Sequence, residues 1–474
     1  MNNSIPYKDI SKKERKTFRN FKPFWNEELT NLWKEMVRSR KNYEKFKGER
    51  HVQNRLRAEY KDKRNLFDKR LRQEERRYNR GKMLEIESLE SQNPNEFWDK
   101  VQKLGPRAQK GIPMEVVTED GEVKTSPEEV LQKWQSEFSK MYSGPVGEVF
   151  DQEFYDIKML EKMLLEDEQN DPLFITNHYL NNEITLSEIL RNTKKLKRNK
   201  AMGIDCIPNE VLKGKQVGLL FVHLFNSCFD KGIIPNQWRL ANVFPIPKNP
   251  LDDKRNPMTY RGISLLSTIS KVYTSLLNER ILNYLETENK LVDEQNGFRK
   301  GRSCNDHIFT LTSVIQARLQ ERHSTFCAFI DMKKAFDFVN RELLFFKLLH
   351  NNIDGKMYKS IKALYSKTSS RVQVNDCFTS WFLTTSGVRQ GDNLSPTLFA
   401  IFLNDLAVEL NGLNLGVTID NEKLTILMYA DDIVLLAENK ADLQKLLDYV
   451  ATWCKNWQLV LNDKKSQVVH FRKS

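Results

Sequence analysis

Three aspartates lie at the ends of short apolar segments, where their carboxylates could bind a divalent cation. Asp331 directly follows the β-rich run 326–330, and the adjacent pair Asp431 and Asp432 interrupts the apolar stretch 424–438. Hard carboxylate oxygens are the ligands that Mg²⁺ prefers, and a pair of such ions stabilises the attacking and leaving oxygens of a phosphoryl displacement. The three acids therefore indicate metal-assisted chemistry on phosphate groups.

Two elements must position these acids. Residues 326–330 predict a buried strand that ends at Asp331, and residues 424–438 predict a β-hairpin with both remaining acids at its tip. Two carboxylates about 4 Å apart repel by roughly 4 kcal/mol at an effective dielectric constant near 20, which a shared proton or a bound cation would offset. A solvent-exposed turn would also relieve the repulsion. The third acid at a strand end and the flanking apolar runs favour the metal interpretation.

A glycine-containing loop before a predicted helix is a weaker candidate for the same site. Gly387 and Gly391 bracket Gln390, and Ser395-Pro396 then predicts the start of a helix, with serine as the N-cap and proline in the first turn. Glycine lets a backbone approach a nucleotide or template closely. A purely structural loop is an equally good interpretation of this segment taken alone.

The composition restricts the class of protein. The chain has 474 residues and a formal net charge of +12, a surplus that favours an anionic partner such as nucleic acid. Its six cysteines are far apart and lack zinc-site or disulfide spacing, which is typical of free thiols in a reducing compartment. Neither an apolar run of bilayer-spanning length nor a secretion signal is present. We therefore expect an intracellular protein without a membrane partner.

Residues 34–80 are strongly basic and predict a long helix. They contain 18 Lys and Arg against 8 Asp and Glu, with no proline and one glycine. Apolar residues recur at intervals of four and seven and form a narrow stripe along such a helix. These residues are Leu56, Tyr60, Phe67, Leu71 and Tyr78. The helix is either a nucleic-acid-binding arm or a solvated helix that packs its stripe on a neighbour, and the two can coexist.

The rest of the chain changes from irregular structure to dense alternation of helices and strands. A hairpin with its turn at Asp120-Gly121 precedes a helix over residues 127–142, which Ser126 would cap. Residues 144–171 are acidic and weakly patterned, which predicts a linker. From Leu186 onward, helices and short strands alternate to the C-terminus.

Three motifs resemble those of the reverse-transcriptase family and follow the family's order. They are Asp331-x-x-Lys334-Ala335-Phe336-Asp337, Arg389-Gln390-Gly391-x-x-Leu394-Ser395-Pro396, and Tyr429-Ala430-Asp431-Asp432. Within the family the chain is most similar to LINE-type, non-LTR retrotransposons. Segments that resemble their fingers and the regions before it are 196–213, 245–272 and Gln295-x-Gly297-Phe298-Arg299-x-Gly301-Arg302-Ser303. The segments 25–29 and 96–104 resemble the region that joins an endonuclease to the polymerase in such proteins.

The resemblance implies an α+β fold of the right-hand polymerase type, with fingers and an antiparallel-sheet palm after a mostly helical basic N-terminal region. The implied domains are residues 1–110 for the basic region, 111–180 for a hairpin, helix and acidic linker, 181–324 for the fingers with its N-terminal extension, and 325–474 for the palm. We expect the family's thumb and endonuclease to be absent, so that the chain is a fragment with a weak grip on primer and template.

The resemblance also implies roles for single residues. Asp331, Asp431 and Asp432 are expected to bind two Mg²⁺ ions, for which Mn²⁺ could substitute, with the Met332 carbonyl as a further ligand. Lys465, in the motif Leu461-Asn462-x-x-Lys465-Ser466, would be a general acid near the departing pyrophosphate, with a structural lysine as the alternative. The expected substrate-binding residues are Lys248, Arg261, Phe336, Gln390 and Gly391. The expected nucleic-acid-binding residues are Arg299, Arg302 and Tyr429.

Within these sets, Phe336 matches the aromatic gate that excludes a 2′-hydroxyl. Lys248 and Arg261 resemble the cations on the incoming triphosphate, although Lys248 could be an ordinary surface lysine. Gln390 and Gly391 would line the nascent base pair. Arg299 and Arg302 are expected on template phosphates, because copying cannot depend on base sequence.

These roles imply an RNA-directed DNA polymerase of a retrotransposon that transfers nucleotides from dNTPs to a primer 3′-hydroxyl, with template RNA and a DNA primer as partners. The alternative is an inactive, RNA-binding remnant of a truncated element. Phe336 disfavours an RNA-templated RNA polymerase, which needs a smaller or polar residue there. We expect the protein in the nucleus and the cytoplasm. Residues 194–198 resemble a nuclear localisation signal, but a basic helix end, which family members carry at this place, is the favoured interpretation.

Overall fold

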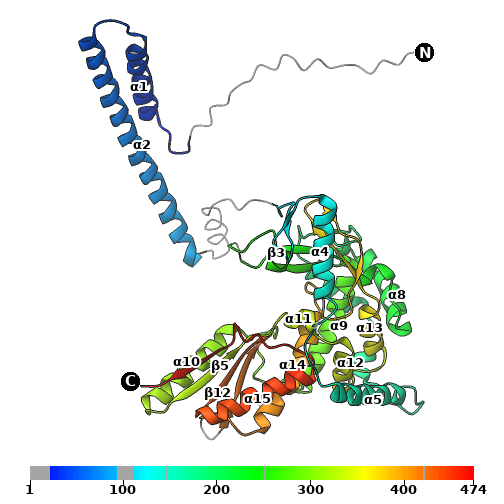
Figure 1. Cartoon of the computed structure of the whole chain (residues 1–474). Coiled ribbons are helices and arrows are strands. Elements are labelled where there is room, and N and C mark those ends of the chain that lie inside the picture. The colour runs from blue at the N-terminus through cyan, green and yellow to red at the C-terminus, as the bar shows by residue number, and fades with distance from the viewer. Residues whose placement is uncertain (1–21, 93–110, 146, 250, 420–421, 474) are drawn as a thin grey trace, which may run out of the picture. The chain divides into compact units, whose positions relative to one another are not determined.

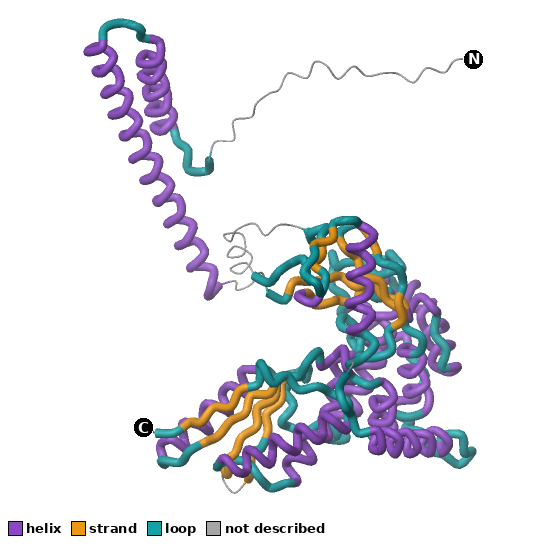
Figure 2. The backbone as a smooth tube through the Cα atoms, in the orientation of Figure 1, coloured by secondary structure: helices purple, strands orange, loops and turns teal. Residues whose placement is uncertain are grey.

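A computed structural model describes residues 22–92, 111–145, 147–249, 251–419 and 422–473 of the chain (Figures 1 and 2). The chain divides into two compact units, Met1–Lys110 and Gly111–Ser474. The second unit combines helices with antiparallel strand pairs, which confirms the α+β class. In the described ranges, no helix has both the length and the apolar character needed to cross a bilayer. The segment 96–104 lies outside the described residues.

The first unit is a pair of helices joined by a short loop. Helix α1 (Glu27–Lys45) ends at Phe46, where the backbone becomes extended, and helix α2 (Arg50–Gln92) follows. The prediction of one continuous helix over residues 34–80 is therefore wrong. The loop contains Gly48, and glycine is about 1 kcal/mol less favourable than alanine inside a helix.

The predicted apolar stripe of α2 packs against α1 and the residues that precede it. The ring of Phe67, the buried member of the stripe, lies 5.9 Å from the ring of Trp25. Tyr60 stacks on Tyr43 of α1 with 6.5 Å between ring centroids. The structure thus contains one of the two alternatives for this region: the stripe packs on a neighbouring helix.

The second unit begins with the predicted hairpin, in which β1 (Val116–Val117) pairs with β2 (Val123–Lys124). Helix α4 (Pro127–Met141) follows at the predicted place, although the Ser126 side chain makes no cap hydrogen bond. The prediction of a linker over residues 144–171 is wrong, because helix α5 (Gln152–Glu168) occupies most of it. Its apolar side chains give a weak helical pattern because several of them are exposed: Ile157, Leu160, Met163 and Leu164.

An antiparallel four-stranded sheet forms one part of this unit. Its strands, in the spatial order β11-β12-β5-β13, are β11 (Ile426–Tyr429), β12 (Asp432–Ala437), β5 (Thr325–Ile330) and β13 (Gln467–Phe471). Alternate residues face two apolar clusters, as expected for a buried sheet. Cys327 packs with Val314 of α10 (Cys304–Gln320), and Ala328 belongs to the largest core, which also includes Leu443 of α15 (Lys440–Asn456).

A second sheet contains both parallel and antiparallel pairs. Its strands are β4 (Tyr260–Leu265), β3 (Leu240–Pro247), β6 (Ser369–Val374) and β7 (Cys377–Phe378), with β8 (Phe382–Leu383) paired to β6. β3 is antiparallel to β4 and parallel to β6. Because β6 to β8 lie beyond residue 325, the predicted boundary between 181–324 and 325–474 does not separate the two sheets.

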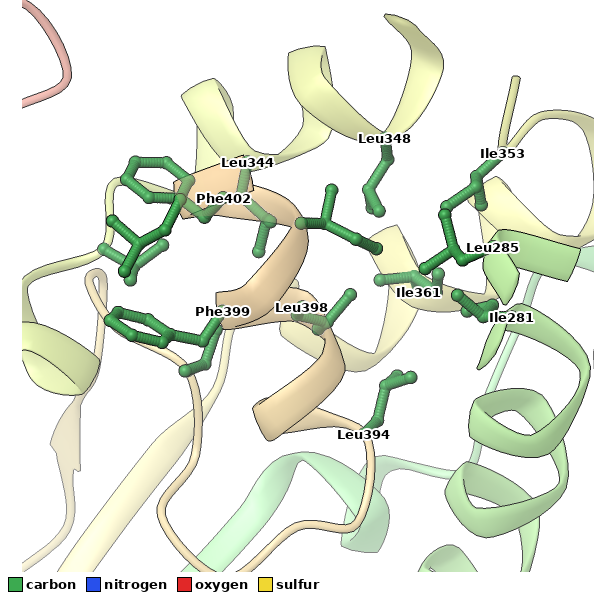
Figure 3. Packing of buried hydrophobic residues seen from close by; sticks show 14 of the residues in the cluster. Ile281, Leu285, Leu344, Leu348, Ile353, Ile361, Leu394, Leu398, Phe399 and Phe402 are labelled. Atoms are coloured by element: carbon green, nitrogen blue, oxygen red, sulfur yellow. The ribbon is translucent and has the colours of Figure 1, made fainter. Parts of the chain in front are cut away.

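Helices from many parts of the second unit share one large apolar core. Figure 3 shows Leu398 of α14 (Ser395–Gly412) on the side of that helix toward Ile281 and Leu285 of α9 (Thr268–Thr287), whereas Phe399 points to the other side. Helices α12 (Arg341–His350) and α13 (Gly355–Tyr365) also contribute to this core. The remaining described elements are α6 (His178–Asn181), α7 (Leu186–Lys194), α8 (Lys215–Lys231), α11 (Ala335–Phe338), β9 (Val417–Ile419), β10 (Glu422–Leu424) and three short 3₁₀ segments, Val211–Lys213, Asn236–Arg239 and Pro257–Thr259.

Candidate active site

Strand β5 and the β11–β12 hairpin bring the three predicted acids to one end of the antiparallel sheet. Ile433 of β12 pairs with Ile330 of β5, so the next positions in that register, Asp432 and Asp331, face each other. Opposed residues of an antiparallel pair project from the same face, with Cα atoms about 4.5–5.5 Å apart. Asp431 occupies the turn beside them. The predicted strand end and the predicted hairpin with two acids at its tip are both present.

Asp331 is held by the segment that follows α15. The Asn462 side-chain amide donates to Asp331 Oδ2 at 2.6 Å, and the Asn462 N–H donates to the Asp331 carbonyl at 2.9 Å. The Ser466 hydroxyl accepts from the Asp331 N–H at 3.2 Å, and Lys465 Nζ lies 4.0 Å from Asp331 Oδ2. Asn462 thus holds the carboxylate of Asp331, and Ser466 holds its backbone. In the sequence, the only signal for this role was the motif that also contains Lys465.

The second acid is electrostatically coupled to the other two. Burial, and then the charges of Asp432 and Asp331, raise the pKa of Asp431 above its usual range. Carboxylates that repel one another in this way are stabilised by a cation. Within the described part of the chain, however, no three His, Cys, Asp or Glu side chains are close enough to hold a metal ion as they stand. The three carboxylates are brought to the same end of the sheet, but they do not form a complete metal coordination sphere.

The turn that bears the acids is clamped by Gln295. The sequence indicated this residue only as the first position of the motif Gln295-x-Gly297-Phe298-Arg299 and gave it no role. Ala430 adopts a left-handed backbone conformation, with φ +58°. Gln295 is fully buried; its Oε1 accepts the N–H groups of Ala430 at 2.9 Å and of Gly297 at 2.8 Å, and its Nε2 donates to the Ala430 carbonyl at 3.3 Å. A Cβ atom added to Gly297 would lie 2.3 Å from the Ala430 nitrogen. This close packing holds the strained turn in place.

A cavity of about 780 Å³ opens beside the acids. A volume of this size is typical of small-molecule sites. Most of the predicted metal and substrate residues line it: Lys248, Arg261, Asp331, Met332, Phe336, Gln390, Gly391, Asp431 and Lys465. These residues come from segments far apart in the sequence, so the fold brings them together.

The positive side of the cavity comes from the β3–β4 hairpin and the loop after β5. Lys248 follows β3, and Arg261 lies in β4. Burial, and then the positive charges of Lys334, Arg261 and Lys465, lower the pKa of Lys248, an effect that the Asp337 carboxylate opposes. Positive charges this close repel one another, and an anionic ligand relieves the repulsion. This side of the cavity therefore suits a phosphate group.

Phe336 lies on the cavity wall in a fixed aromatic stack. Its ring lies 4.3 Å from the ring of Phe399 in α14, with an angle of 18° between the planes. On another side Phe298 meets it edge-on at 6.1 Å. Because α14 and the motif with Phe298 fix the ring on two sides, Phe336 is a rigid part of the wall.

The predicted loop residues Gln390 and Gly391 lie at the cavity next to the buried acid Asp337, a motif residue to which the sequence assigned no role. The Gln390 amide donates to both carboxylate oxygens of Asp337, at 3.0 and 3.1 Å. Burial raises the pKa of Asp337 to about 6, against the opposing effects of Lys334 and other cations. Gly391 has φ +111°, and an added Cβ would lie 2.7 Å from the Ser264 carbonyl oxygen, so the loop depends on glycine there.

Residues 246–474 match the family of reverse transcriptases, described as RNA-dependent DNA polymerases. This matched region, slightly less than half of the chain, is similar to a reverse transcriptase domain. The match starts within β3 and contains all three acids and the clamp at Gln295.

Similar proteins agree with this assignment. The chain is similar to the probable RNA-directed DNA polymerase from transposon BS of Drosophila melanogaster, 32% identical over 292 residues, which are 60% of this chain and 32% of that protein. It is also similar to the RNA-directed DNA polymerase from mobile element jockey of the same species, 27% identical over 61% of this chain and 32% of that protein. A type-1 retrotransposable element R2 Pol polyprotein of Popillia japonica is 29% identical over 50% of this chain and 33% of that protein.

These relatives confirm the predicted resemblance to non-LTR retrotransposon reverse transcriptases. The chain spans about a third of their length. Among solved structures, apo telomerase from Candida tropicalis truncated from its C-terminal domain is similar with a TM-score of 0.39 and 13% identity, over 54% of this chain and 56% of that chain.

Four predicted residues of the matched region do not line the cavity. Asp432 is exposed as the first residue of β12, and Tyr429 is half-buried opposite it. Arg299 is buried; its guanidinium donates to the Glu286 carboxylate at 2.7 and 2.8 Å and to the Val292 carbonyl. Its side chain therefore braces the segment that clamps Ala430 and is not available for the template contact that the resemblance implied.

Arg302 is also engaged within this segment. It donates to the carbonyl and the carboxylate of Asp293 and, at 3.3 Å, to the side chain of Asn296. Its side chain is one-third exposed and Asp293 is highly exposed, so this pairing is weak and could be exchanged for a phosphate.

Proposed function

We propose that this protein is an RNA-directed DNA polymerase that adds deoxynucleotides from dNTPs to a primer 3′-hydroxyl on an RNA template. The observation that supports it most strongly is the combination of acids from β5 and the β11–β12 turn with the cations Lys248 and Arg261 on one cavity. Carboxylates for divalent cations and basic groups for a triphosphate are the two parts that nucleotidyl transfer requires. The names of the relatives support the RNA template and the DNA product.

We assign the antiparallel sheet with α12, α14 and α15 to a palm, and the β3–β4 hairpin with α7 to α9 to fingers. The position of the acids on the former and of the phosphate-facing cations on the latter supports this division. The basic helical pair of the first unit and the segment from β1 to α5 precede both.

The residues present fit a divalent metal centre. Asp331, Asp431 and Asp432 offer hard oxygen ligands. Burial first, and then repulsion from Asp432 and Asp331, raise the pKa of Asp431, and a cation would relieve that repulsion. These three acids, with the Met332 carbonyl, would hold Mg²⁺, or Mn²⁺ in its place. When bound, such ions supply charge stabilisation at the attacking and leaving oxygens of the displacement.

The protein's own groups then have separable tasks. Arg261 and Lys248, with Lys334 nearby, would bind the triphosphate, and Lys465 would give a proton to the departing pyrophosphate. Gln390, held by Asp337, and Gly391 would contact the nascent base pair. The stack of Phe336 on Phe399 would leave no room for a 2′-hydroxyl and so select dNTPs.

The decisive test is extension of a DNA primer on an RNA template with Mg²⁺ and dNTPs. The variant Asp431→Asn should lose extension by more than about 100-fold, the size of effect seen when charge stabilisation is removed from a transition state. Asp463→Asn is the matched control, since Asp463 is exposed and outside the cavity, and should retain full activity. Full activity in Asp431→Asn would refute the proposal. A wild-type chain that binds primed RNA but never extends it would support an inactive remnant instead.

Nucleotide selection is tested separately. Phe336→Val should raise incorporation of rNTPs relative to dNTPs by at least tenfold, with primer binding unchanged. An unaltered ratio would remove the gate role from Phe336 and reopen the choice between DNA and RNA product.

A further inference from the structure

Helix α2 has one face lined by four basic side chains: Lys69, Arg72, Arg76 and Arg80. Spacings of three and four residues place them on a single side of the helix, over a length of about 17 Å. All four side chains are exposed. In the described part of the chain none of them forms an ion pair, whereas their neighbour Arg70 pairs with Glu28. We call these four residues the outer basic stripe.

The stripe lies away from α1. The residues of α2 that contact α1 and its preceding segment are Tyr60, Lys63, Phe67 and Arg70, which follow one another at the same helical spacing on a different side. Figure 2 shows α1 along one side of α2 only. The stripe is therefore not needed to hold the two helices together.

Helix stability does not account for the stripe either. Arg72 and Arg76, and likewise Arg76 and Arg80, are like charges four residues apart, an arrangement that destabilises a helix by a few tenths of a kcal/mol per pair. On the same pair of helices, Arg40 and Arg64 each have an acid at the fourth following position. An anion lying against this face would relieve the repulsion between these cations.

We propose that the outer basic stripe, none of whose residues lines the polymerase cavity, binds the phosphodiester backbone of a nucleic acid. Three of the four residues are arginines, whose planar guanidinium groups bind phosphate oxygens in pairs. No large apolar side chain lies between them, so the stripe does not fit insertion into a lipid surface. Backbone contacts of this kind add affinity without sequence selection.

The test compares two fourfold variants of the full chain with identical charge changes. The stripe variant is Lys69→Gln, Arg72→Gln, Arg76→Gln and Arg80→Gln. The control is Arg38→Gln, Lys41→Gln, Arg50→Gln and Arg55→Gln, which removes three arginines and one lysine that are also exposed. Circular dichroism at 222 nm must show equal helix content. Binding of a labelled RNA hairpin and of a DNA duplex of equal length is then measured by anisotropy between 50 and 200 mM KCl.

For four phosphate contacts, the slope of log K against log salt should become shallower by about 3 to 4 in the stripe variant, since each contact contributes about 0.9. The control should change it by less than 1. If the slope of the stripe variant becomes shallower on both the RNA hairpin and the DNA duplex, the stripe binds nucleic-acid backbones in general. If it becomes shallower on the RNA hairpin alone, the ligand is RNA. Equal slopes for stripe variant and control, or a loss seen only on phosphatidylserine vesicles, would overturn the proposal. Asp431→Asn should keep the wild-type slope, so failure here is distinct from failure of the polymerase assignment.

Discussion

Gln295 and Ala430 are joined by two hydrogen bonds between one buried side-chain amide and both backbone groups of one strained residue. Ala430 is the last residue before the acidic pair. Its left-handed conformation decides the direction in which Asp431 leaves the turn. The clamp therefore controls the acids although Gln295 contacts neither carboxylate.

Replacing Gln295 with methionine should misplace the acids while preserving side-chain volume. The substitution leaves three backbone groups unpaired, the N–H and carbonyl of Ala430 and the N–H of Gly297, at a cost of about 1–3 kcal/mol for each one that stays buried. We expect a loss of stability of that order and, in addition, a rise of about tenfold or more in the Mg²⁺ concentration needed for half-maximal primer extension. The measurement is a Mg²⁺ titration of extension at constant primer and dNTP.

Asn226→Leu is the matched control for this variant. The Asn226 amide bonds the N–H and carbonyl of Ile184 at 2.8 and 2.9 Å, outside the cavity. It should lose similar stability with no change in Mg²⁺ dependence. If both variants shift the Mg²⁺ titration equally, Gln295 has only a general structural role.

Gly297→Ala tests the same clamp from the backbone side. The new Cβ would lie 2.3 Å from the Ala430 nitrogen, a contact that only displacement of the turn can relieve. We expect extension activity to fall more than tenfold. Gly81→Ala, in α2 with no atom within 4 Å of the added Cβ, should instead stabilise its helix by about 0.5–1 kcal/mol. Normal activity in Gly297→Ala would mean that the turn tolerates displacement.

The sequence predicted the elements that hold the acids, because apolar runs with period-two burial identify β5 and the β11–β12 hairpin without knowledge of the fold. It did not predict α5, whose apolar side chains remain exposed in part, or the break between α1 and α2. A single glycine in a basic segment was too weak a signal for that break. The parallel pairing of β3 with β6 depends on contacts between residues more than a hundred positions apart, which local patterns do not encode.

The same distinction holds for the site. Strand-end acids and glycine loops have local signatures, and the cavity contains them. Gln295 and Asp337 stand within such motifs, but their roles have no local signature, because they depend on distant partners, Ala430 and Gln390. Family resemblance named Arg299 as a template contact, but it could not reveal that Glu286 already pairs with it.

Asp337 should make stability depend on pH. Its pKa rises from 3.8 to about 6 on folding, so between these values the folded state binds more protons than the unfolded state. Its stabilising contribution is complete below pH 3.8 and is lost as the pH rises through 6. Asp337→Asn should therefore gain in unfolding free energy relative to wild type, by up to about 3 kcal/mol between pH 4 and pH 7.5.

Denaturant unfolding of wild type and Asp337→Asn at several pH values measures this difference. If the gain in unfolding free energy of Asp337→Asn over wild type becomes smaller as the pH rises, Lys334 and the other cations lower the pKa of Asp337 instead. Because the Asp337 carboxylate also holds Gln390, the stabilised variant should have a higher KM for dNTPs at neutral pH.

Arg299 and Arg302 should differ when each is replaced by methionine. Arg299 is 5% exposed in its side chain and pairs with Glu286, whose pKa it lowers chiefly through their hydrogen bond. Breaking a buried pair costs about 3–5 kcal/mol, and the partial exposure of Glu286 brings the expected loss to about 2–3 kcal/mol. Arg302→Met should cost less than about 1 kcal/mol. For RNA binding we expect the opposite order of effects. Arg302→Met should make the slope of log K against log salt shallower by about 0.9, the contribution of one phosphate contact, and Arg299→Met should leave the slope unchanged. A shallower slope in Arg299→Met with native stability would restore the template contact that its motif first suggested.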